Sequence, residues 1–154
     1  MQWVRLLHLL GMAMWVGAFS SVGALGRQAL GETEPAARKA LWRAAVRGNG
    51  FALGGAAVAI TTGLVTFFYF LRLNSYLKQP WMHGKLTLAV IFVALHVLVT
   101  LKVRRDAAAT SSSASAPGAP AGSPGLYILA NALGGPLAFG ILFFVILRPW
   151  ERLF

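Results

Sequence analysis

Four long apolar stretches, separated by shorter polar or basic segments, dominate the hydrophobic pattern of this sequence. They cover residues 6–25, 51–71, 82–101 and 126–147. A helix needs about 20 apolar residues to cross the hydrocarbon core of a bilayer, and each stretch is long enough. The pattern therefore predicts an all-α fold, an integral membrane four-helix bundle that forms a single transmembrane domain.

The connection between the first two stretches, residues 26–50, is rich in arginine. Within it, Glu34 to Val46 could form a short helix on the membrane surface, with Leu41 and Trp42 dipping inward. The sequence Gly48-Asn49-Gly50 is expected to end this helix before the second span begins.

Most of the connection between the last two stretches, residues 107–125, consists of alanine, serine, proline and glycine with one threonine. Such a composition cannot bury a core, so residues 107–125 are expected to form a flexible linker. Inside the last stretch, Gly134-Gly135-Pro136 predicts a kink or close helix packing. In the second stretch, Thr62 and Thr66 share a helix face and can bond to backbone carbonyls or to a neighbouring helix.

One face of the first stretch combines a histidine with large apolar residues: His8, Met12, Trp15, Phe19 and Val22. Their spacing is helical, and His8 is better placed inside a bundle than against lipid, so this face is expected to point inward. A cleavable signal peptide is the alternative for this stretch, although its preceding segment carries a single charge.

Composition narrows the class of protein. The 154 residues are 57% hydrophobic and 12% charged, whereas soluble domains carry about 25% charged residues. The absence of cysteine excludes disulfides, iron–sulfur clusters and thiolate haem ligation. Hydrolysis by an intramembrane carboxylate is also disfavoured, because the only acids, Glu32, Glu34, Asp106 and Glu151, lie outside the apolar stretches.

The net charge of +10 comes from lysines and arginines that flank the apolar stretches. This placement indicates anchoring at lipid headgroups, and no pattern typical of nucleic-acid binding is present. With four spans, both termini lie on one side, and the opposite side carries eight basic residues against six. We therefore expect a multi-pass protein of a bacterial cytoplasmic (inner) membrane with its termini on the non-cytoplasmic side.

The chemistry is expected at four ionisable residues: His8, His83, Lys85 and His96. Such groups are costly in hydrocarbon unless they have a partner, a ligand or a route to water. The first and third spans enter from the same side, so His8, His83 and Lys85 should lie near one membrane face. His96 follows Lys85 by 11 residues, about 16 Å deeper on the same helix face.

Imidazole nitrogens bind iron, and a buried tetrapyrrole suits an apolar bundle. His8 and His96 are therefore candidate ligands of haem b, with His83 as a further candidate metal ligand. Lys85 and Arg148 could bind carboxylates of the cofactor or of a substrate, and Asn131 could bond to His96. Copper binding, proton transfer and a quinone pocket remain compatible with the same residues.

These residues also carry a family resemblance. The chain resembles the HemJ-type protoporphyrinogen oxidases in His8 followed by Trp15-Val16-Gly17, in Trp81-Met82-His83-Gly84-Lys85-Leu86, in His96 and in Arg148-Pro149-Trp150. This family is related to the CopD-like copper-resistance membrane proteins. The Trp-x-His-x-Lys-Leu element is the most specific part of the resemblance.

The resemblance implies oxidation of protoporphyrinogen IX to protoporphyrin IX, a bound haem b, and electron transfer to the respiratory chain through a quinone. It implies that His8 ligates haem, with Trp15 beside the cofactor, and that His83 and Lys85 form the catalytic pair of the third helix.

Two other functions stay open. One is a non-enzymatic haem-carrying or structural subunit of a respiratory or photosynthetic complex, in contact with other membrane subunits or a second copy of the chain. It is favoured by the lack of an acid in the stretch Asn131 to Pro136. The other is a CopD-like copper transporter, for which Met12 and Met14 would join His8 as ligands.

Overall fold

A computed structural model describes residues 2–70, 80–112 and 123–146. Within these ranges the chain is helical, without strands, which confirms the all-α prediction. The helices are α1 (Gln2–Gly31), α2 (Pro35–Val65), the π-helical extension η1 (Thr66–Phe70), α4 (Pro80–Ser112) and α5 (Gly125–Ile146).

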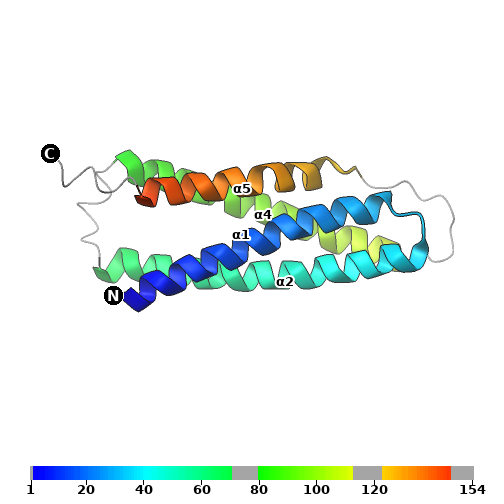
Figure 1. Ribbon diagram of the computed structural model, residues 1–154, viewed down its shortest axis with the longest axis horizontal. Helices are drawn as coiled ribbons and strands as arrows, with labels where there is room; N and C mark the ends of the chain where they lie inside the picture. Colours follow the sequence, from blue (N-terminus) through cyan, green and yellow to red (C-terminus); the bar gives the residue numbers. More distant parts are fainter. Residues whose placement is uncertain (1, 71–79, 113–122, 147–154) are drawn as a thin grey trace.

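The helices form an elongated up-down-up-down bundle (Figure 1). Helices α1 and α2 make a long antiparallel hairpin, and α5 runs back along α1 and α4. Helices α1 and α4 begin at the end of the bundle where α2 and α5 finish. The first and third apolar stretches therefore start on the same side, as the sequence predicted.

Among the described residues, α1, α4 and the continuous segment Pro35–Phe68 are long and apolar enough to cross a membrane. In α5, a shorter apolar segment covers Gly125–Gly140. Each predicted span falls within one helix or its π-helical extension, apart from Leu71 and Leu147, which lie outside the described residues.

The first connection differs from the prediction. Helix α1 continues to Gly31, and α2 begins only a few residues later, where Glu34 accepts hydrogen bonds from the backbone N–H groups of Ala36 and Ala37 and Pro35 opens the helix. The prediction of a separate surface helix that ends at Gly48-Asn49-Gly50 was therefore wrong. The helix continues there because Asn49 is buried against α4, and tertiary packing outweighs the glycines.

The predicted linker also begins later than expected. Helix α4 extends to Ser112, so residues 107–112 are helical, and the rest of the segment up to residue 122 lies outside the described residues. Helix α5 then runs through Pro136 without ending. Close packing is confirmed at Gly134, where an added Cβ would lie 3.1 Å from Oγ of Ser20.

The core runs along the line where α1 meets the other helices. The inward face predicted for α1 is confirmed, since Met12, Trp15, Phe19 and Val22 are buried and His8 is partly buried. Small residues bring α1 and α2 together. A Cβ added at Gly55 would lie 2.5 Å from the backbone nitrogen of Trp15. This close approach fixes which residues of the two helices lie at the same level.

Candidate functional site

His8 is held at the start of α1 by a backbone carbonyl of α2. Its Nδ1 lies 2.8 Å from the carbonyl oxygen of Ala59 and 3.3 Å from Oγ1 of Thr62. The ring packs against Gly63, where an added Cβ would lie 3.1 Å from Cε1 of His8. Because a carbonyl oxygen only accepts, Nδ1 of His8 carries the proton and Nε2 presents its lone pair.

This geometry is the one that metal-binding histidines usually have. They donate the second ring N–H to a carbonyl or carboxylate, which fixes the tautomer and the ring orientation. The threonine pair predicted in α2 lies in the same region. Thr62 donates to the carbonyl of Val58, and Thr66 donates to the carbonyl of Thr62. His8 is therefore suited to bind a metal through Nε2.

Lys85 lies near His8, although it belongs to α4. It is partly buried, and its ammonium group is close enough to His8 to interact electrostatically with the imidazole. Two of the residues expected at one face of the bundle are thus brought together from separate helices. A ligand held by His8 would lie within range of this positive charge.

His96 has a different environment. It is 3% exposed and surrounded by aromatic rings, with Phe19 5.3 Å and Trp15 5.8 Å away between centroids. Nε1 of Trp15 donates a hydrogen bond of 2.7 Å to Nδ1 of His96. The indole N–H can only donate, so Nδ1 of His96 accepts and Nε2 carries the proton.

This tautomer does not suit an iron ligand. Metal binding through Nε2 requires a free lone pair on this nitrogen. Nε2 carries the proton as long as Nδ1 accepts from Trp15. Nε2 of His96 is instead a buried donor without a hydrogen-bond partner among the described residues. The pairing therefore argues against His96 as an axial ligand and makes it a buried hydrogen-bonding residue.

The three histidines do not form a common metal site. The described part of the chain holds no group of three or more histidine or acidic residues suited to a metal ion. His96 lies at the level of Trp15, which is about 10 Å along α1 from His8. Since imidazole nitrogens bind metals at about 2 Å, His8 and His96 do not reach the same ion. His83 is exposed at the start of α4.

The remaining predicted site residues are distributed as follows. Trp15 bonds to His96, as described. Asn131 is exposed and is not the partner of His96; its backbone packs against α1, where a Cβ added at Gly23 would lie 3.2 Å from the Asn131 nitrogen. Arg148 lies outside the described residues.

Two polar contacts were missed in the sequence. Asn49 of α2 is buried and accepts a hydrogen bond of 3.0 Å from Thr100 of α4. Near the end of α4, Asp106 binds Lys102 at 2.8 Å and accepts a hydrogen bond of 2.9 Å from the hydroxyl of Tyr127. A lone acid among basic residues after an apolar stretch could have indicated the second contact.

Comparison of the chain with protein-family models, with curated protein sequences and with solved structures returned no match.

Proposed function

We propose that the chain is an integral membrane protein of a bacterial inner membrane that binds haem b through Nε2 of His8. The membrane assignment is supported by the long apolar helices and by large apolar side chains on their outer faces, including Leu10, Val90 and Phe139. In water these side chains would be left exposed, whereas lipid covers them.

The observation that carries the haem proposal is the hydrogen bond from Nδ1 of His8 to the carbonyl of Ala59. It leaves Nε2 in the ligand form and orients the ring on a rigid helix pair. Lys85, close to His8, is positioned to pair with a propionate. Bound haem would supply one-electron transfer to an acceptor in the membrane, such as a quinone.

The reaction we propose is oxidation of protoporphyrinogen IX, on the strength of the resemblance to HemJ-type oxidases. His83 is exposed and can exchange protons with solvent, and Lys85 can hold a substrate carboxylate. Expression in bacterial cells that lack their own protoporphyrinogen oxidase tests this proposal. Growth without added haem is expected, and its loss in Lys85→Met. Absence of growth, although the protein purified from haem-supplied cells carries haem, would contradict the proposal.

A non-enzymatic haem-carrying subunit is the second candidate. It is favoured by the position of the described carboxylates, because Glu32, Glu34 and Asp106 lie at the end of the bundle remote from His8. No described carboxylate is therefore available near His8 to accept protons from a porphyrinogen. Co-purification of the chain with other membrane subunits in stoichiometric amounts, without growth rescue, would select this function.

The copper alternative has less support. Met12 is buried whereas Met14 is 42% exposed, since residues two apart lie on different sides of a helix. The two sulfurs therefore do not converge with His8 on one ion. Copper bound in a stoichiometric amount to the purified protein, in place of haem, would reverse this conclusion.

A further inference from the structure

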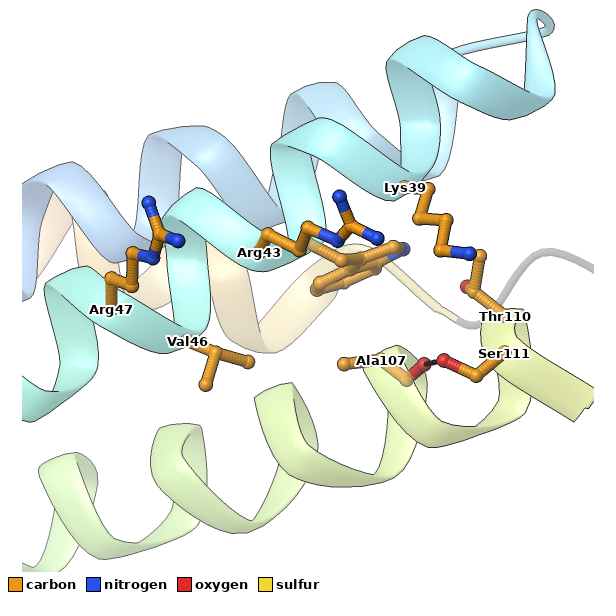
Figure 2. Close-up of a pocket in the computed structure, with 8 residues that line it drawn as sticks. Lys39, Arg43, Val46, Arg47, Ala107, Thr110 and Ser111 are labelled. Carbon is orange, nitrogen blue, oxygen red and sulfur yellow. Dashed lines mark hydrogen bonds between the residues drawn. The ribbon is translucent and has the colours of Figure 1, made fainter.

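A basic cleft lies at the opposite end of the bundle from His8. It opens between α2 and the last turns of α4 and has a volume of about 240 Å³. Figure 2 shows Val46 of α2 facing Ala107 of α4, with Lys39 extending toward Thr110 and Ser111. The complete lining consists of Lys39, Trp42, Arg43, Val46, Arg47, Ala107, Thr110 and Ser111.

Among the described residues, no carboxylate pairs with the cations of the cleft. Lys39, Arg43 and Arg47 follow one another at four-residue intervals on one face of α2, and all three are exposed. Within the described ranges the ion pair found is Lys102–Asp106, and this carboxylate also accepts the Tyr127 hydroxyl. The three cations therefore favour an external anion.

The opposite wall offers hydrogen-bond acceptors. The hydroxyl of Thr110 donates to the carbonyl of Asp106, and the hydroxyl of Ser111 to that of Ala107, each at 3.0 Å. Their oxygens keep lone pairs that can accept from a ligand. A ligand that suits both walls carries a phosphate for the cations and hydroxyl groups for Thr110 and Ser111.

The cleft also borders the apolar part of the bundle. Arg47 precedes Phe51, which is 67% exposed on the same helix, by about 6 Å along the axis. The headgroup layer on each side of the hydrocarbon is about 5–7 Å thick. Arg47 thus lies at the depth of lipid phosphates, and Arg43 and Lys39, about 6 and 12 Å further along the helix, lie on the aqueous side of these phosphates.

We propose that this cleft is a binding site for the phosphate of an anionic phospholipid with a hydroxylated headgroup, of the phosphatidylglycerol type. Arg47 binds the phosphodiester, Arg43 and Lys39 attract it by their positive charge, and the headgroup hydroxyls extend along the cleft toward Thr110 and Ser111. The proposal rests on the membrane placement of the helices but not on haem. A bound lipid connects the first turns of α2 with the last turns of α4.

The test measures lipid binding to the full-length detergent-solubilised protein by native mass spectrometry with dioctanoyl phosphatidylglycerol. Dioctanoyl phosphatidylcholine and inorganic phosphate are the comparison ligands. The cleft variant is Lys39→Gln/Arg43→Gln/Arg47→Gln. The matched control, Arg27→Gln/Arg104→Gln/Arg105→Gln, removes three exposed cations of the same end that do not line the cleft.

One phosphatidylglycerol per chain is expected, bound roughly 100-fold more weakly by the cleft variant, because each basic residue near an anionic surface contributes about a factor of five. Val46→Trp, which fills the cleft without changing charge, should weaken binding as well. An equal loss of phosphatidylglycerol binding in the control variant would overturn the assignment of the binding site to the cleft. Inorganic phosphate binding as tightly as the lipid would overturn the lipid assignment. Haem content is measured separately, so a loss of lipid binding does not test the proposal that His8 binds haem.

Discussion

Trp15 of α1 donates a hydrogen bond of 2.7 Å to the Nδ1 atom of His96 in α4. The bond lies in a closed aromatic cluster, where the rings of Trp15 and Phe92 are 4.7 Å apart. It satisfies one nitrogen of a buried histidine and assigns the proton to the other. Trp15 and His96, which the sequence predicted to contact a cofactor, are thus hydrogen-bonded to each other.

Trp15→Phe is expected to destabilise the bundle by roughly 1–3 kcal/mol, because Nδ1 of His96 would be left buried without its donor. Unfolding in detergent mixtures of increasing denaturing strength measures this change. Trp3→Phe is the control, since Trp3 is 77% exposed. Equal stability of Trp15→Phe and the unmodified chain would show that water or a ligand replaces the indole N–H.

Trp15→Phe combined with His96→Phe should be more stable than Trp15→Phe alone. Replacing both hydrogen-bond partners by apolar groups removes the unsatisfied polar atoms together. The His96→Phe substitution also removes the unpartnered Nε2 of His96. The comparison uses the unfolding midpoints of the two variants. A double variant less stable than Trp15→Phe would mean that His96 is stabilised by a contact beyond those described.

Gly55→Ala is expected to cost about 1–3 kcal/mol of stability, because its Cβ would lie 2.5 Å from the Trp15 backbone nitrogen and 2.9 Å from the Gly11 carbonyl oxygen. Backbone atoms cannot rotate away, so α1 and α2 must separate. The neighbouring Gly54→Ala is the matched control, with nothing within 4 Å of the added Cβ. It should be neutral or stabilising by up to about 1 kcal/mol. Similar effects of both would contradict the close approach.

Tyr127→Phe should destabilise the protein by roughly 1.5–3 kcal/mol, the usual range for a hydrogen bond to a charged group. The Tyr127 side chain is fully buried, and its hydroxyl bonds to the carboxylate of Asp106. Thermal unfolding of the detergent-solubilised protein measures the effect, with Ser21→Ala as an exposed hydroxyl control. A change below about 0.5 kcal/mol would mean that Lys102 alone satisfies Asp106.

Helical periodicity was sufficient to predict the helices and the inward face of α1, because burial of Trp15, Phe19 and Val22 follows from their spacing. Local rules failed at Gly48-Asn49-Gly50, where the contact from Asn49 to Thr100 keeps the helix continuous. That contact joins residues far apart in the sequence, so no local pattern reveals it.

For the candidate site, the sequence predicted that His8 and Lys85 lie at one end of the bundle. It could not predict the tautomers of His8 and His96, which depend on a carbonyl of α2 and an indole of α1. For the same reason the sequence predicted Asn131, and not Trp15, as the hydrogen-bond partner of His96.

We propose that His8, and not His96, binds haem. The most direct test is the reduced-minus-oxidised visible spectrum of the purified protein beside His8→Ala and His96→Phe. We expect a b-type α band in the unmodified chain and in His96→Phe, and its loss in His8→Ala. A spectrum without haem bands from haem-replete cells, or a band that survives in His8→Ala and disappears in His96→Phe, would contradict this assignment.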